Sequence, residues 1–155
     1  MGKAHHYKTT VTWTGNKGTG TSAYRAYERS HILSIEHKTA LDMSSDPAFL
    51  GDSTKHNPEE LLLASLSSCH MLWYLHLCAN AGVVVTAYTD EASGIMEENE
   101  NGGRFTTVTL YPCVTVATAT MIEKANALHA EANKKCFIAN SCNFPVKHVP
   151  QCKEG

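Results

Sequence analysis

The feature that most constrains the fold is one long apolar segment between Asn57 and Gly82. Asn57 is a suitable N-cap residue, Pro58 suits the first helical position, and Glu60 can reach back to the cap. Gly82 can end a helix because it adopts the left-handed conformation at little cost. The segment therefore predicts a helix of about 24 residues, roughly 36 Å long.

The composition of this helix indicates that most of its surface is covered. Residues 61–77 are apolar on most faces and include Trp73 and Tyr74, so we expect burial all round or nearly so. A chain of 155 residues would struggle to cover such a helix alone, so a dimer with this helix at its centre is the simplest arrangement. A membrane span is the competing interpretation, but serines and histidines interrupt the run and the sequence shows no second span.

The flanking segments alternate apolar and polar residues or carry turn residues. Before the helix we expect a strand over 6–13, a glycine-rich loop over 15–20, one or two short strands within 31–43 and a loop over 44–56. After it we expect a strand over 83–98, a turn over 99–103, a hairpin partner over 104–116, a second helix opened by a capping box over 120–123, a short helical turn over 136–142 and a strand or tail over 144–149. This order of elements predicts an α+β domain.

Length, charge and cysteine usage narrow the class of protein. The chain fits a single domain over residues 1–155. It carries 13 basic and 15 acidic residues without a block of like charge, which gives no electrostatic case for binding nucleic acid or an anionic membrane. The six cysteines are irregularly spaced and the first residues lack the apolar run of a signal peptide. We therefore expect free thiols in a reducing, cytoplasmic compartment.

Two of the cysteines have neighbours that indicate chemistry. Cys69 lies beside Ser67, Ser68 and His70, a polar stretch within an apolar helix that suits the lining of a pocket. Cys136 follows two lysines and stands where a helical turn is expected to begin, and both features stabilise a thiolate. Ordinary packing in the core or at a helix end is the alternative for each. If both react, one thiol attacks and the other resolves the product as a disulfide.

Two further ideas concern a carboxylate and metal ions. Glu59 precedes Cys69 by roughly 15 Å along one helix, so it can assist that thiol only across a dimer of antiparallel helices. Otherwise it is an exposed charge that matches the helix dipole. The cysteines and histidines lack the close spacing of a zinc clasp, so we predict no metal site and no cofactor. We assign no role to the other four cysteines, Cys78, Cys113, Cys142 and Cys152.

Three motifs, Asn57-Pro-Glu-Glu-Leu, Ser68-Cys69-His70 and Lys135-Cys136-Phe-Ile-Ala-Asn140, together resemble those of the OsmC/Ohr family, the osmotically inducible and organic hydroperoxide resistance proteins. With the strand order, the resemblance covers nearly the whole chain. It implies an OsmC-like intertwined homodimer, with long central helices packed between antiparallel β-sheets and a site at each subunit interface. The implied activity is that of a thiol-dependent, peroxiredoxin-like enzyme that reduces organic hydroperoxides to alcohols in an oxidative stress response.

Carried over residue by residue, the resemblance makes Cys69 the peroxidatic cysteine, Cys136 the resolving cysteine and Glu59 the family's catalytic glutamate. Cys69 would become a sulfenic acid and then form a disulfide with Cys136. An external dithiol, in the family a dihydrolipoyl group on a lipoylated protein, would restore both thiols. An apolar lining of Leu66, Met71, Trp73 and Phe137 would favour organic hydroperoxides over hydrogen peroxide.

The chain departs from the family pattern in two places. The arginine that lies beside the reactive thiolate has no match just before the Asn-Pro-Glu motif, so Arg29 is our candidate and Arg25 the second. Phe137 stands where the family commonly has proline, which bears on how easily the disulfide forms. Two alternatives therefore stay open: a catalytically weak OsmC-like small-molecule binding or stress protein, and a structural or metal-holding dimer.

Overall fold

The computed structural model describes residues 2–155. The chain divides into two compact units, of which the first ends at Leu61 and the second comprises Leu62–Gly155. The first residue of the predicted single domain lies outside the described residues, and a single domain over 1–155 stays a prediction. The chain combines two long helices with one antiparallel and two mixed sheets, so the predicted α+β class is confirmed.

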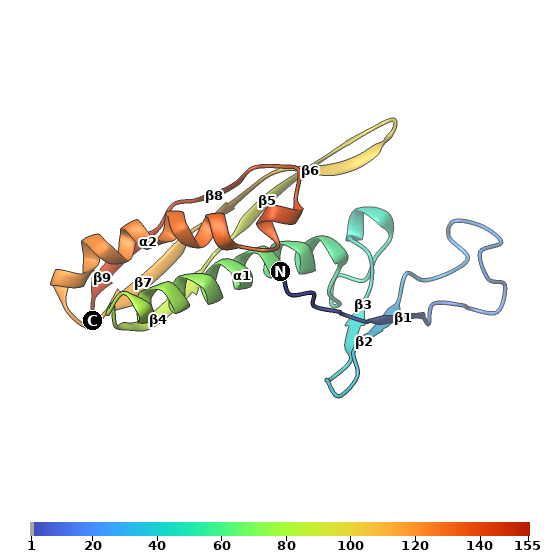
Figure 1. Ribbon diagram of the computed structural model, residues 1–155. Coiled ribbons are helices and arrows are strands. Elements are labelled where there is room, and N and C mark those ends of the chain that lie inside the picture. The colour runs from blue at the N-terminus through green and yellow to red at the C-terminus, as the bar shows by residue number, and fades with distance from the viewer. Residues whose placement is uncertain (1) are drawn as a thin grey trace. The chain divides into compact units, whose positions relative to one another are not determined.

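The first unit is built on a small antiparallel sheet (Figure 1). Its strands are β1 (Thr10–Trp13), β2 (His31–Ser34) and β3 (Leu41–Met43), in the order β1-β2-β3, and a 3₁₀ turn η1 (Pro47–Phe49) follows. The two short strands expected within 31–43 are confirmed. The strand expected over 6–13 forms only in its second half.

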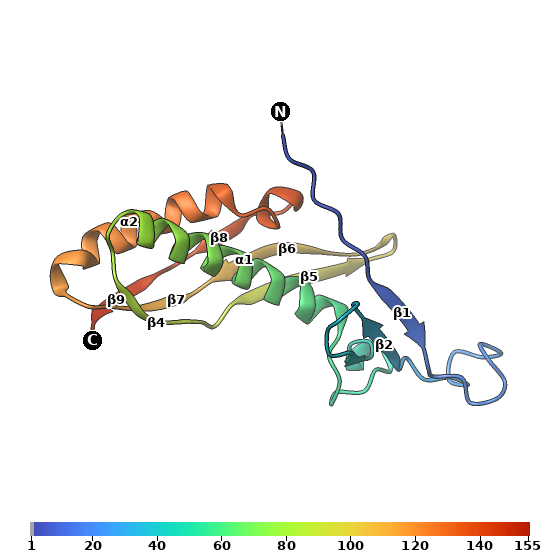
Figure 2. The same ribbon diagram turned by 60° about the horizontal axis from the view of Figure 1, so that its bottom comes forward.

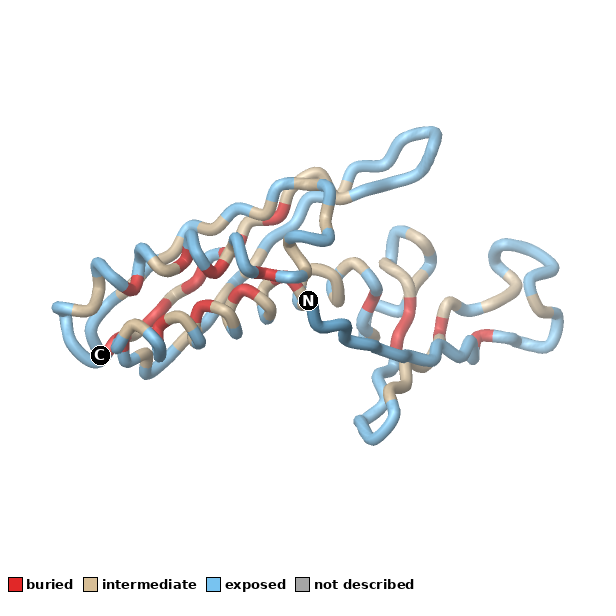
Figure 3. The backbone as a smooth tube through the Cα atoms, viewed as in Figure 1, coloured by how far each residue is buried: buried red, intermediate tan, exposed pale blue. Residues whose placement is uncertain are grey.

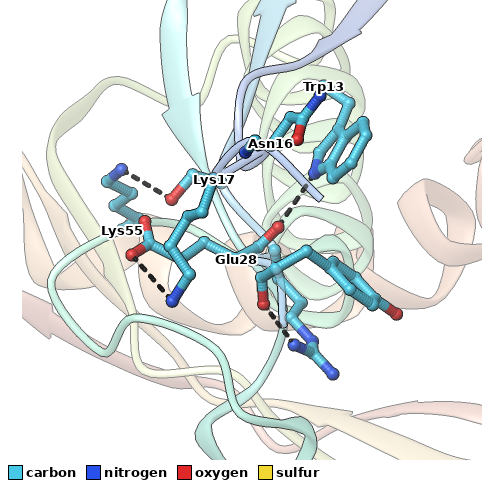
Figure 4. A network of polar contacts seen from close by, with 9 residues as sticks. Trp13, Asn16, Lys17, Glu28 and Lys55 are labelled. Atoms are coloured by element: carbon cyan, nitrogen blue, oxygen red, sulfur yellow. Dashed lines mark hydrogen bonds and ion pairs between the residues drawn. The ribbon is translucent and has the colours of Figure 1, made fainter. Parts of the chain in front are cut away.

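A polar network fixes the loop between β1 and β2 (Figure 4). The indole nitrogen of Trp13 donates to the carbonyl oxygen of Glu28 at 2.8 Å, and the ammonium of Lys17 lies 3.8 Å from the Glu28 carboxylate. Gly15 is required here, since a Cβ at that position would lie 1.9 Å from the Glu28 carbonyl oxygen. The predicted glycine-rich loop is thus an ordered connection.

Helix α1 (Pro58–Asn80) begins and ends as its sequence predicts. The backbone N–H of Glu60 donates to the side-chain oxygen of Asn57 at 2.8 Å, and the Asn57 N–H donates back to the Glu60 carboxylate at 3.2 Å. Gly82 follows the helix with φ of +72°, the left-handed conformation that suits glycine. The predicted capping box is confirmed.

The single chain buries one face of α1. One stripe with four-residue spacing is buried, formed by Leu66, His70, Tyr74 and Cys78. Leu72, on another face, is 63% exposed, and Figure 3 shows exposed and intermediate residues alternating with the buried ones. The single chain therefore leaves much of α1 uncovered, and burial on nearly all sides, which was expected from a dimer, stays a prediction. Helix α1 is long and apolar enough to cross a membrane, a test that core helices of soluble proteins also pass.

The second unit places the rest of α1 and a second helix alongside two sheets (Figure 1 and Figure 2). Its further elements are β4 (Val85–Asp90), β5 (Ser93–Asn99), β6 (Gly102–Leu110), β7 (Pro112–Val116), η2 (Ala119–Met121), α2 (Ile122–Lys135), η3 (Ala139–Ser141), β8 (Val146–His148) and β9 (Gln151–Glu154). The sheets have the orders β4-β7-β9 and β5-β6-β8, with the pairs β6/β8 and β7/β9 parallel. Strand β9 was not predicted.

The two long strands expected after α1 are each broken in two. Asp90 ends β4, and its carboxylate accepts hydrogen bonds from the backbone N–H of Tyr111 at 2.7 Å and from the Ser67 hydroxyl at 2.5 Å. Pro112 follows Tyr111 and has no N–H to offer a ladder. The side-chain acceptor and the proline therefore let β4 and β5, and likewise β6 and β7, belong to different sheets.

The start of α2 also differs from the prediction. The hydroxyls of Thr118 and Thr120 lie 2.9 Å apart, and neither caps the helix. A 3₁₀ turn precedes α2, whose N-cap is Met121 without a side-chain hydrogen bond. The predicted capping box over 120–123 is wrong because the hydroxyls bind each other.

Two apolar clusters form the core of the second unit. In the larger one, the α1 stripe and α2 pack on one face of the β4-β7-β9 sheet, with Tyr74, Val114 and Ala125 fully buried. In the smaller one, Leu66 packs against Val108 and Leu110 of β6. Burying each large apolar side chain contributes about 1.5–3 kcal/mol to the stability of the fold. The buried stripe of α1 therefore holds this helix against the two sheets.

Candidate functional site

Cys69 opens onto an apolar cavity of the second unit. It is partly buried on α1, next to the buried stripe, and lines an apolar hollow of about 520 Å³. The polar lining comes mainly from two serines one helical turn apart, Ser65 and Ser68. The remaining lining residues are Leu72, Trp73, His76, Phe137 and Ile138. The expectation that Cys69 lines a pocket is confirmed.

Cys136 lies beside Cys69 although the two are far apart in the sequence. It follows the last turn of α2 as the C-cap residue and is 1% exposed. The Cys69 thiol is close enough to raise its pKa, and the Cys136 sulfur accepts a hydrogen bond from the Ala139 N–H at 3.4 Å. The structure thus brings together the two cysteines that the sequence singled out.

The ionisation expected of Cys136 is wrong. Burial, and with a smaller effect the neighbouring Cys69 thiol, raise the pKa of the Cys136 thiol to about 11, although the hydrogen bond from the Ala139 N–H lowers it slightly. The lysines that were expected to stabilise the thiolate have other partners, since Lys134 pairs with Glu131 at 2.7 Å. Cys136 also stands at the C-terminal, negative end of α2. It is therefore a protonated thiol at neutral pH.

Aromatic side chains form one wall of the cavity. Trp73 meets Phe137 edge to face, with ring centroids 5.4 Å apart and planes at 89°. The predicted lining by these two residues is confirmed. Leu66 is instead fully buried in the core, and Met71 is not among the residues that line the cavity, so both of these expectations are wrong. Leu72 and Ile138 take their places.

His70, the residue after Cys69, belongs to a buried cluster of three histidines. The ring nitrogens His70 Nε2 and His129 Nδ1 are 3.0 Å apart, and the ring of His148 stacks 5.6 Å from that of His70. Burial, with smaller effects of neighbouring histidines, lowers the pKa of His70 to about 4 and that of His129 to about 3. Both are therefore neutral at pH 7. The sequence analysis missed His129 and His148; His129 falls four residues after Ala125 on the inner stripe of α2, and this spacing could have revealed it.

Arg29 and Glu59 lie in the first unit. The Arg29 guanidinium donates to the carbonyl oxygens of Tyr27 at 2.7 Å and Tyr24 at 2.8 Å, and it lies 4.3 Å from the centre of each tyrosine ring. Glu59 has one carboxylate oxygen that is buried without a hydrogen-bond partner. An unpaired buried carboxylate oxygen is energetically costly. The roles of both residues toward Cys69 stay predictions.

The other four cysteines remain free thiols. Cys78 is 2% exposed and belongs to the larger apolar cluster, whereas Cys113, Cys142 and Cys152 are partly buried. Within residues 2–155, no group of three or more histidine, cysteine, aspartate or glutamate side chains is arranged to hold a metal ion.

The sequence model of the OsmC-like protein family matches residues 51–149. The chain belongs to the OsmC-like family. The matched residues include all of α1 and both site cysteines, so the resemblance to OsmC/Ohr proteins is confirmed. A search of curated proteins found no match to this OsmC-like chain.

Solved structures of other OsmC-like proteins share the fold. An OsmC-like protein of unknown function from Vibrio cholerae is 29% identical, with a TM-score of 0.86, and the alignment covers 96% of this chain and 100% of that one. An organic hydroperoxide resistance protein from Elizabethkingia anophelis is 18% identical, with a TM-score of 0.68 and coverage of 99% and 100%. One from Legionella pneumophila is 16% identical, with a TM-score of 0.65 and coverage of 97% and 99%. The structural relatives thus include hydroperoxide resistance proteins.

Proposed function

We propose that this OsmC-like protein is a thiol-dependent peroxidase that reduces organic hydroperoxides to alcohols. One observation carries the proposal: Cys69 and Cys136, which are far apart in the sequence of the second unit, lie close together beside an apolar cavity. Cys69 lines that cavity, whereas Cys136 is buried and is not among the residues that line it. This difference in access supports Cys69 as the attacking thiol and Cys136 as the resolving one.

The reaction follows from thiol chemistry. The Cys69 thiolate attacks the distal oxygen of the hydroperoxide, the O–O bond breaks, and Cys69 becomes a sulfenic acid. The leaving alkoxide takes a proton from water and departs as the alcohol. The Cys136 thiol then attacks the Cys69 sulfur, the S–S bond forms and water leaves. A dithiol reductant, such as the dihydrolipoyl group of a lipoylated protein, exchanges with this disulfide and restores both thiols.

The cation that stabilises the Cys69 thiolate has to come from elsewhere. Among the described residues that line the cavity, none is lysine or arginine. We assign this role to Arg29, with Arg25 second, and we assign to Glu59 the task of orienting the arginine through its unpaired oxygen. Glu59 and Cys69 are roughly 15 Å apart along α1, so this arrangement requires a second copy of the chain.

The exposed apolar surface beside the site supports a homodimer. Leu72 is 63% and Phe137 is 65% exposed, and both border the cavity. A second α1 packed across this surface would cover it and complete a site at the subunit interface. We further propose a cytoplasmic location, which keeps the thiols reduced, and no nucleic-acid or membrane partner.

Steady-state turnover tests the proposed function. With dihydrolipoamide as reductant, we expect the enzyme to consume cumene hydroperoxide with a higher kcat/KM than hydrogen peroxide, because the cavity offers almost no polar contacts. Equal efficiencies would contradict the substrate class, and no turnover with either peroxide would contradict the activity. Cys113→Ser is the matched control, since Cys113 is a partly exposed thiol away from the cavity, and it should behave as wild type.

A catalytically weak binding protein is the second candidate, and the geometry of Arg29 favours it. The guanidinium already has two carbonyl acceptors and two aromatic rings as partners within its own unit. A variant that lacks both Arg25 and Arg29 separates the cases. Full peroxidase activity in that variant would reject our arginine assignment, and a wild-type protein that binds an apolar ligand without turnover would establish the binding role.

A further inference from the structure

Trp73 contacts the chain on both sides of Cys136. Its ring meets Phe137, the residue after Cys136, at 5.4 Å, and the ammonium of Lys135, the residue before it, lies 5.7 Å from the centre of the same ring. Trp73 stands one helical turn after Cys69 on α1, so it connects the helix that carries one thiol to the segment that carries the other.

This contact adds to the apolar packing of the same segment, in which Ile138 and Ala139 lie against the cluster of Leu66, Val108 and Leu110. Phe137 is 65% exposed, so apolar burial alone does not explain its position. The backbone after Cys136 is organised locally, with Asn140 N–H donating to the Cys136 carbonyl at 3.0 Å and Ser141 donating its hydroxyl to the Phe137 carbonyl at 2.8 Å. These bonds shape the turn but do not tie it to α1. Apolar packing beside Leu66 connects the later part of the turn to α1, and the ring of Trp73 connects the residues on either side of Cys136 to the same helix through an aromatic pair and a cation–π contact.

We propose that Trp73 is a positioning residue that holds Cys136 against Cys69 and thereby sets how fast the sulfenic acid is resolved. The inference rests on the proposed peroxidase function for its kinetic consequence. The step it governs is the attack of the Cys136 thiol on the Cys69 sulfenic acid, in which the S–S bond forms, the S–O bond breaks and water leaves. Without the contact, the segment around Cys136 samples other positions and the sulfenic acid lives longer.

The test measures how the sulfenic acid divides between two fates. Reduced protein receives one equivalent of cumene hydroperoxide in the presence of dimedone, which traps sulfenic acids, and mass spectrometry gives the ratio of dimedone adduct on Cys69 to Cys69–Cys136 disulfide. This ratio does not depend on how fast the sulfenic acid forms. Trp73→Ala should raise it roughly tenfold, the change that loss of an aromatic pair and a cation–π contact corresponds to.

Conservative and control variants separate positioning from general loosening of the fold. Trp73→Phe keeps a ring for the contact with Phe137 and should give a ratio near wild type. Phe137→Ala removes the other half of the pair at an exposed position, so it tests the proposal even if Trp73→Ala does not fold. Tyr111→Ala removes an exposed aromatic ring elsewhere in the same unit and should leave the ratio unchanged. Wild-type ratios in both Trp73→Ala and Phe137→Ala would overturn the proposal.

A second readout works without peroxide and separates this proposal from the proposed function. Equilibration with mixtures of oxidised and reduced dithiothreitol gives the reduction potential of the Cys69–Cys136 pair. Loss of the contact should make the disulfide roughly tenfold easier to reduce, a shift of about 30 mV for a two-electron couple. If the wild-type protein does not react with peroxide but Trp73→Ala still shifts the reduction potential, the peroxidase function is contradicted and the positioning role is supported. Equal potentials in wild type and Trp73→Ala would contradict the positioning role itself.

Discussion

The buried histidines make the stability of this protein sensitive to mild acid. His70 and His129 are 1% and 0% exposed and share a contact of 3.0 Å, so neither can accept a proton without placing a charge in the core. Their pKa values are lowered in the folded chain from 6.5 to about 4 and about 3. Between pH 6.5 and about pH 4 the unfolded chain therefore binds more protons than the folded one, and stability falls as the pH falls.

The size of the effect follows from these pKa values. Each histidine lowers the free energy of unfolding by about 2 kcal/mol between pH 7 and pH 5, and the pair by about 4 kcal/mol. Burial also lowers the pKa of His148, which acts in the same direction. Urea unfolding at a fixed protein concentration, followed by circular dichroism at pH 7, 6 and 5, measures the slope.

Two variants assign the slope to the cluster. His129→Gln removes one titrating group and should roughly halve the loss between pH 7 and pH 5. His76→Gln changes an exposed histidine on the same helix as His70 and should keep the wild-type slope. A wild-type free energy of unfolding that is the same at pH 5 as at pH 7 would refute the reasoning, because neutral buried histidines require the loss.

Three other predictions concern the thiols, the helix cap and the strand corner. Cys69→Ser should abolish peroxide reduction, whereas Cys136→Ser should stop after one turnover with a sulfenic acid that dimedone traps; continued turnover in either variant contradicts the assignment. Asn57→Ala removes the acceptor for a helical N–H and should lower the free energy of unfolding by about 1 kcal/mol in urea titrations, with no change contradicting the cap. Asp90→Ala leaves the Ser67 hydroxyl and a backbone N–H without their acceptor and should cost about 3 kcal/mol in the same assay; a cost below that of the Asn57 variant would show that the corner does not depend on this carboxylate.

The sequence predicted the parts of the fold that local chemistry decides. The α1 cap depends on Asn57 and Glu60, three residues apart, and its end depends on Gly82, so the pattern was sufficient. The α2 cap failed although its letters fit the same pattern, since the threonine hydroxyls at 118 and 120 bind each other. The strand break at Asp90 also escaped prediction, because its cause is contact with residues far away in the sequence.

Some features of the candidate site could likewise be predicted from the sequence, and others depend on the folded chain. That Cys69 and Cys136 are the thiols of interest followed from their neighbours and from the resemblance to a known family. The protonation of Cys136 did not, because it depends on burial and on the thiol beside it, which only the folded chain supplies. The histidine cluster was missed for a related reason: its three members come from α1, α2 and β8 and meet only in the core.

A thiol count with peptide mapping shows whether Cys69 and Cys136 form a redox pair. Reduced protein receives one equivalent of cumene hydroperoxide at neutral pH, free thiols are counted, and a digest is searched for a linked peptide. We expect the loss of two thiols per chain and a Cys69–Cys136 disulfide. Unchanged thiols, or a disulfide between other cysteines, would contradict the redox pair.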